Sequence, residues 1–306
     1  PASTAITSVV AIGPSALGDG SGMSTTGNGS IAIGSAAGNN VKNLAGEFVI
    51  IGNNAGQKIN GTGVTHIGYQ AGTFATGSNN TFVGTEAGYG GATSAPFSSG
   101  VNNTAVGYQA LTAFTTGGSN TAMGRKALED VSSGGYNVAV GNEAGLNLTT
   151  GGENGGAGTG VLTSAADGTV AIGYTAGAAI TSGANNLAIG HEALKTNTTG
   201  HSNIAIGHGV MDDTDAGSNS LDSDHNVFIG NGAGSGTWTD AKSEYNTVVG
   251  NNALAGALEA AVYNVGLGYR AGQSLTAGDS NVIIGGIAGN NITGGLRNVV
   301  IGYNVA

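Results

Sequence analysis

Residues 120–128 read NTAMGRKAL, and residues 137–145 repeat the phrase as NVAVGNEAG, seventeen positions later. Both fit one template, Asn-x-x-(Ile/Val)-Gly-x-x-Ala-(Gly/Leu), whose first glycine is called the anchor glycine below. Such a repeat decides the fold class before any other feature does. The anchor glycines are Gly13, Gly34, Gly52, Gly68, Gly84, Gly107, Gly124, Gly141, Gly158, Gly173, Gly190, Gly207, Gly230, Gly250, Gly268, Gly285 and Gly302, with Gly158 in a degenerate copy.

The length of the repeat restricts its structure. Seven of the sixteen steps between anchors are seventeen residues long, which is too short for two helices or for a propeller blade. We therefore expect each copy to be one coil with two short strands and two turns. The sequence predicts an all-β parallel β-solenoid, or β-roll, of about 17 coils that forms a single repeat domain over residues 1–306.

The phrase NTAVG at residues 103–107 also predicts which side chains face inward. In a strand, Thr104 and Val106 lie on one face and Ala105 on the other. We expect the Ile/Val position to form an interior column, the Ala105 position to face outward against other copies, and the asparagines to form an amide ladder. The residues predicted to carry the repeat are Asn103, Val106, Gly107, Ala110, Asn120, Gly124, Asn137, Gly141, Gly190, Gly207 and Gly285.

Composition excludes several function classes. The chain has 8 Lys and Arg against 18 Asp and Glu, a net charge of −10, 60 glycines and no cysteine. A basic patch for nucleic acid or an anionic bilayer is missing, so neither partner is expected. The absence of cysteine excludes disulfides and thiolate metal sites and is typical of an extracellular or virion-surface protein. No apolar run reaches eighteen residues, so no membrane insertion is expected.

The phrase resembles the repeats of known fibrous proteins. Asn-x-Ala-(Ile/Val)-Gly is similar to the head repeat of trimeric autotransporter adhesins, in which three chains each wind a left-handed parallel β-roll. The variant GYQAL at residues 107–111, with NTTG at 197–200, is more similar to repeats of bacteriophage tail fibres. The adhesin repeat is shorter than seventeen residues. Because the chain begins PASTAITS and stops within a repeat, we expect a cleaved or truncated product.

The resemblance implies a homotrimeric shaft or head of a phage tail fibre that mediates attachment to the host. Its partners would be copies of itself, other virion tail proteins, and a glycan or protein receptor on the host surface. Its location would be the virion, or else a cell surface. Two alternatives stay open: the head domain of a bacterial trimeric surface adhesin, and a polysaccharide-degrading tailspike. An ice-binding solenoid is disfavoured, because Thr104 and Thr121 are followed by Val138 in that column.

Insertions into the repeat predict where a receptor would bind, because extra residues must bulge from the coil. The longest are residues 89–102, 209–225 and 231–245. Aromatic rings flanked by carboxylates are common in sugar sites, so the insertion at residues 231–245, with its tryptophan, is a candidate receptor surface. The alternative is that this tryptophan packs against the solenoid. The candidate receptor-binding residues are Phe97, Trp238, Asp240 and Tyr245.

Metal binding has two candidate places. Asp213 and Asp215, in a D-x-D-x-G segment, resemble part of a calcium loop. The helices and closing glutamate of an EF-hand are missing, so a solvated acidic loop is favoured and no cofactor is expected. His191 and His208 occupy the same position in adjacent coils and could bind a metal on a threefold axis. Tyrosine, asparagine, threonine and arginine also fill that position, which favours an outward face instead.

Catalytic motifs are missing from the sequence. There is no G-x-S-x-G elbow, no H-E-x-x-H and no glycine-rich loop followed by Lys-Ser/Thr. Outside the acidic segment, Asp240 with Glu244 is the one carboxylate pair that could cleave a glycosidic bond. Glu143 and Glu192 recur within the template but lie on distant coils. We therefore expect a structural protein and no enzyme.

Overall fold

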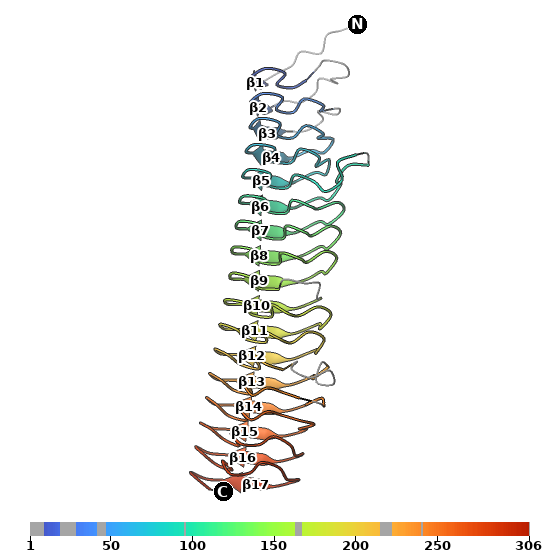
Figure 1. Ribbon diagram of the computed structural model, residues 1–306. Helices are drawn as coiled ribbons and strands as arrows, with labels where there is room; N and C mark the ends of the chain where they lie inside the picture. Colours follow the sequence, from blue (N-terminus) through green and yellow to red (C-terminus); the bar gives the residue numbers. More distant parts are fainter. Residues whose placement is uncertain are drawn as a thin grey trace. The chain divides into compact units, whose positions relative to one another are not determined.

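The computed structural model describes residues 9–18, 29–41, 47–94, 96–162, 167–214, 222–239 and 241–305, and all regular structure among them is β. The chain forms a parallel β-solenoid and divides into two compact units, residues 1–153 and 154–306 (Figure 1). The strands of the first unit are β1 (Val10–Ile12), β2 (Ile31–Ile33), β3 (Phe48–Ile51), β4 (Val64–Ile67), β5 (Thr81–Val83), β6 (Thr104–Val106), β7 (Thr121–Met123) and β8 (Val138–Val140).

The second unit is built from the same coil. Its strands are β9 (Gly155–Ala157), β10 (Val170–Ile172), β11 (Leu187–Ile189), β12 (Ile204–Ile206), β13 (Val227–Ile229), β14 (Thr247–Val249), β15 (Val265–Leu267), β16 (Val282–Ile284) and β17 (Val299–Ile301). Strand β9 belongs to the degenerate copy, so that copy is confirmed as a coil. Among the described residues each coil contributes one strand, where two were expected.

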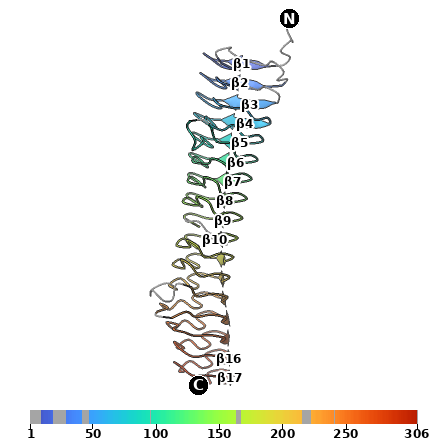
Figure 2. The same ribbon diagram turned by 90° about the vertical axis from the view of Figure 1, so that its right-hand side faces the viewer.

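Successive strands within each unit pair in parallel and without a shift in register. Ala105 of β6 pairs with Ala122 of β7, which in turn pairs with Ala139 of β8. The arrows therefore lie one above another along one side of each unit (Figures 1 and 2). Beyond the strand the coil continues as turns, yet the backbone still bonds from coil to coil, as from Leu111 N–H to Ala127 O at 2.9 Å.

The anchor glycine ends every strand at a sharp corner, as predicted. All seventeen anchors have φ between +126° and +150°, a region that other residues rarely adopt. The structure adds a second requirement. A β-carbon on Gly107 would lie 2.3 Å from the carbonyl oxygen of Gly124, and one on Gly124 would lie 2.2 Å from that of Gly141. The backbones of adjacent coils approach too closely for any side chain.

The predicted asparagine ladder is confirmed. The backbone and side-chain N–H groups of Asn120 donate to Oδ1 of Asn103 at 2.9 and 3.2 Å, and those of Asn137 donate to Oδ1 of Asn120 at 3.0 and 3.1 Å. Each amide also donates within its own coil, as from Asn120 to Gly134 O at 3.0 Å. All three asparagines are buried. Their polar groups are thus satisfied by the stacking itself.

The interior column is made by the opposite strand face from the one expected. Ala105, Ala122 and Ala139 are buried, whereas Val106 and Met123 are 37% and 45% exposed. The prediction that Val106 lies inside and that the Ala105 position faces outward is therefore wrong. The reason is the thickness of the coil: the alanine three residues after most anchors, such as Ala110, is buried as well, and small side chains let the two walls pack closely.

Volumes inside a coil are balanced between two positions. Where the interior strand residue is Phe, His or Ile, the fourth residue after the anchor is glycine; where it is alanine, that residue is often leucine or methionine. In the coil of β5, the ring of Phe82 fills the space beside Gly88, and a β-carbon on Gly88 would lie 2.4 Å from it. In the coil of β6, Ala105 is matched with Leu111, and both are fully buried.

This balance predicts strong coupling between Phe82 and Gly88. Phe82→Ala should destabilise the fold by about 3–5 kcal/mol, because it leaves a cavity. Adding Gly88→Leu should recover part of that loss, since it reproduces the pairing of the adjacent coil, whereas Gly88→Leu alone should be severely destabilising. Chemical denaturation of the three variants gives the double-mutant cycle. Additive effects of the two substitutions would contradict the proposed volume exchange.

The close approach of the anchors makes a second prediction, in the coil of β9. Gly158 and Gly160 both have positive φ, but a β-carbon on Gly158 would lie 2.1 Å from Gly173 O, and one on Gly160 meets nothing nearer than 3.7 Å. Gly160→Ala should therefore cost about 1–2 kcal/mol from backbone conformation alone. Gly158→Ala should cost clearly more in the same denaturation experiment. Equal losses would show that backbone approach is unimportant.

Candidate interaction surface

The outward strand face carries an uncharged, mainly aliphatic surface in each unit, which we call the aliphatic ribbon. It consists of the residues three and one before each anchor, such as Val138 and Val140 of β8, which are 48% and 42% exposed. None of these residues in strands β1–β17 is charged. Val, Ile or Leu fills all of the positions but eight, the exceptions being Thr65, Thr81, Thr104, Thr121, Thr247, Met123, Gly155 and Ala157.

Two further outward columns border the ribbon. The exit edge is the residue directly after each anchor, and the entry edge is the residue directly before the asparagine position, so each strand runs from entry edge to exit edge. At the exit edge, Tyr174, His191 and His208 stack with ring centroids 5.1 and 4.9 Å apart. At the entry edge, His225, Tyr245 and Tyr263 stack at 5.1 and 5.2 Å. Rings stacked in this way present their edges to solvent.

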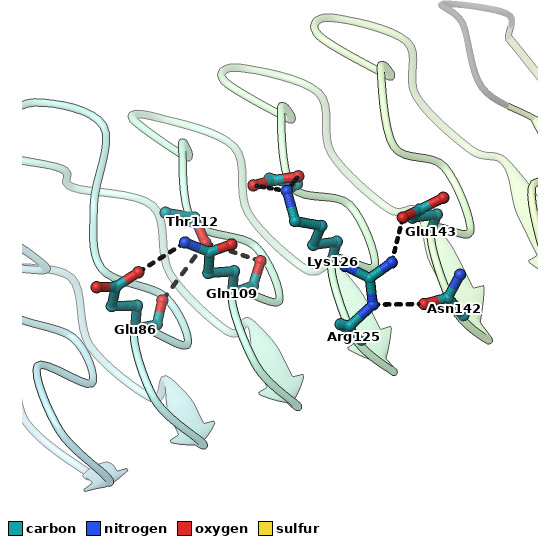
Figure 3. Close-up of polar contacts among 8 residues, drawn as sticks. Glu86, Gln109, Thr112, Arg125, Lys126, Asn142 and Glu143 are labelled. Atoms are coloured by element: carbon teal, nitrogen blue, oxygen red, sulfur yellow. Dashed lines mark hydrogen bonds and ion pairs between the residues drawn. The ribbon is translucent and has the colours of Figure 1, made fainter.

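Charged side chains lie beside the ribbon, mainly in the turn after the anchor, and several bond from coil to coil (Figure 3). Gln109 donates to Glu86 at 2.8 Å, and Arg125 bonds to Asn142 at 2.8 Å and pairs with Glu143. These pairs are exposed or half-buried, so each contributes little to stability.

The single tryptophan does not present a ring to a receptor. Trp238 is fully buried, packs against Phe228 with ring centroids 5.6 Å apart, and donates from Nε1 to Gly234 O at 3.1 Å. Since a sugar needs an accessible ring face, the expectation that Trp238 lies on a receptor-binding surface does not fit this placement. Packing against the solenoid, the alternative weighed for this residue, agrees with the structure. Asp240 lies outside the described residues.

The other aromatic candidates lie on two different surfaces. Phe97, in the insertion 89–102, is half-buried and stacks on Phe74 at 5.9 Å, with the Lys58 ammonium 5.7 Å from its ring centroid. Figure 1 shows this insertion reaching beyond the neighbouring turns, between β5 and β6. Tyr245 is 44% exposed but belongs to the entry-edge stack. Phe97 belongs to the first unit and Tyr245 to the second, and within the second unit Tyr245 is exposed whereas Trp238 is buried.

The acidic segment shows no arranged cation site among its described residues. Asp213 accepts a hydrogen bond from the Thr237 hydroxyl at 2.6 Å, while Asp215 lies outside the described residues. Burial raises the pKa of Asp212, and the charge of Asp213 adds to that shift. Within the described part of the chain, no group of three or more His, Asp or Glu side chains is placed to hold a metal ion.

The two histidines considered as metal ligands are exposed at the exit edge, as the mixed composition of that column predicted. His191 lies 3.8 Å from Glu192, which also pairs with Lys195 at 2.8 Å. The hydrogen bond from Lys195 lowers the pKa of Glu192, and the histidines add to this in smaller measure. Glu143 and Glu192 lie on separate coils, in different units, and each pairs with a cation.

One buried titratable group was not singled out by sequence reasoning. His66 takes the interior strand position in the coil of β4, where it is fully buried and stacks on Phe82 with centroids 4.9 Å apart. Neither ring nitrogen has a hydrogen-bond partner among the described residues. Burial lowers its pKa from 6.5 to about 3. The histidine is therefore held neutral, as an apolar ring would be.

Comparison with known proteins gives no match: no family model fits this chain, and no curated protein resembles it significantly. None of the described residues forms a helix long and apolar enough to cross a bilayer. The role of the surface is therefore inferred from the chemistry of its own residues. An uncharged aliphatic ribbon bordered by aromatic edges is suited to contact with a second apolar surface, since apolar patches of this kind mark interaction sites.

The buried histidine makes stability dependent on pH. Because the pKa of His66 is lower in the folded state, the unfolded chain takes up a proton between pH 6.5 and about 3 that the folded chain does not. The contribution of His66 to stability should be intact above pH 6.5 and fall by about 1.4 kcal/mol per pH unit below it. His66→Phe should flatten the stability profile in this window. An unchanged profile in denaturation experiments would contradict this assignment.

Proposed function

We propose that this chain is a structural and adhesive fibre protein, of the phage tail-fibre kind, that assembles as a homotrimer and attaches to a host surface. The observation that supports this most directly is the aliphatic ribbon. A single chain buries its interior alanines, ladder asparagines and turn leucines but leaves Ile and Val of most strands on the outward face, as in Ile172 of β10, which is 44% exposed. Association with further copies removes this surface from water.

The kind of surface supports a copy of the same chain as the partner of the ribbon. A membrane or nucleic acid would be met by cations, and the chain has 8 Lys and Arg in total. The side chains are short and aliphatic, as in the apolar interfaces of permanent assemblies. A surface repeated from coil to coil is matched in periodicity by another copy of itself. In this proposal the Ile/Val face of the strands, which the sequence analysis placed inside a single chain, lies instead in the core of the fibre.

A host glycan or protein receptor would then bind the surface outside the aliphatic ribbon. The insertion at residues 89–102 supports this role best among the described loops, because it projects beyond its neighbours and carries Phe97 between Phe74 and Lys58. The rigid stack holds the binding surfaces of the copies in fixed positions. Several weak receptor contacts along one fibre can then combine into strong attachment by multivalency. The proposed location is the virion or another extracellular surface.

Charge placed on the ribbon should break the assembly. Ile189→Asp introduces a carboxylate into the half-buried centre of the ribbon on β11, and burial of that charge at an apolar interface is costly. Analytical ultracentrifugation should show a trimer for the parent chain and a monomer for the variant, with unchanged circular dichroism. Ser182→Asp, in an exposed turn away from the ribbon, is the matched control and should stay trimeric. A monomeric parent chain at all concentrations would overturn the proposal.

A further inference from the structure

The two edges of the aliphatic ribbon are complementary in size within single coils. Ten described coils carry a Tyr or His at an edge, and in nine of them at one edge only. In eight of those nine, the opposite edge of the same coil is Gly, Ser or Asn; the ninth has Arg297 opposite Tyr303. The eight pairs, entry edge first, are Gly63–Tyr69, Asn102–Tyr108, Tyr136–Asn142, Gly168–Tyr174, Asn185–His191, Ser202–His208, His225–Asn231 and Tyr245–Asn251.

The entry-edge rings also occupy a backbone conformation that is unfavourable for them. Tyr136, Tyr245 and Tyr263 have φ values of 60°, 57° and 58°, in the left-handed region that Gly and Asn adopt more readily. Burial within the chain does not compensate, since Tyr136 is 70% exposed and Tyr263 is 59% exposed. Tyr136 has no ring contact among the described residues. A contact outside the single chain would explain why a large ring is kept there.

We infer that neighbouring copies of the chain lie parallel and in register, with the aromatic edge of each of these eight coils in contact with the Gly, Ser or Asn edge of the same coil in the next copy. This inference rests on the proposed self-association and adds its direction and register. Rotation about an axis along the stack brings the exit edge of one strand to the entry edge of its own counterpart. In an antiparallel arrangement, the edges of different coils would meet, so the size match between the two edges of one coil would have no role.

The coil of β12 offers a direct test, because the chain contains no cysteine. Ser202 and His208 lie at opposite edges of one strand, and the extended stretch from residue 203 to 207 between them spans about 13 Å, so they cannot form a disulfide within one copy. With Ser202→Cys and His208→Cys in the same chain, register predicts a disulfide between copies. Mild oxidation followed by a non-reducing gel should then show covalent oligomers of the size measured by ultracentrifugation.

The matched control moves one cysteine by two coils. Ser202→Cys with Tyr174→Cys also replaces one exit-edge ring, but register then separates the thiols by about 10 Å along the stack, beyond disulfide reach. This variant should remain uncrosslinked. If the control crosslinks, the proposed register is wrong. If neither variant crosslinks although the protein is oligomeric by mass, the register is also wrong, but self-association still holds. A monomeric mass would overturn both.

The exposed ring at β8 gives a second readout that a purely structural role would not produce. Tyr136→Asn places a residue that tolerates positive φ, so the isolated chain should be no less resistant to denaturant than the parent. The assembly should nevertheless dissociate at a higher protein concentration, by about tenfold, because a ring is lost from the contact. An unchanged dissociation constant would contradict the proposed contact of Tyr136 with the next copy.

Discussion

The backbone approach at the anchor glycines is the constraint on which the rest of this structure depends. A carbonyl of one coil lies where the β-carbon of the preceding anchor would have to be, as between Gly107 and Gly124. Coils this close exchange backbone hydrogen bonds along the strand and through much of the turns. The same closeness aligns each asparagine amide with the one above it. A buried polar ladder is thereby satisfied without water, and it can exist only while the coils stay in register.

Within a coil the walls are so near to each other that the core is filled by small residues and by occasional large ones taken from either side. Phe82 beside Gly88 and Ala105 beside Leu111 are two solutions to the same volume. His66 enters this column as a neutral ring. In these coils a large side chain at one interior position is matched by a small one at the other.

The coil buries only one face of each strand, so the Ile and Val residues of the other face point outward. In water this arrangement is unfavourable for a lone chain and favourable for an assembly. In the proposed fibre, function is a property of extended surfaces: the aliphatic ribbon and its two edges would contact other copies, and projecting turns would contact a receptor. The ribbon positions themselves carry no charged residue.

The sequence by itself determined the solenoid, the number of coils, the glycine corners and the asparagine ladder, because each follows from a residue type that recurs at one position and has few conformational or hydrogen-bonding alternatives. Alternation in NTAVG showed that Val106 and Ala105 face opposite ways, but not which of them faces inward. That was decided by the distance between the walls of the coil, which depends on Ala110 and the turn beyond it. The burial of Trp238 was likewise decided by packing against Phe228, a residue outside its own insertion. Periodicity along a chain identifies equivalent positions, whereas inside and outside are defined only once the walls meet.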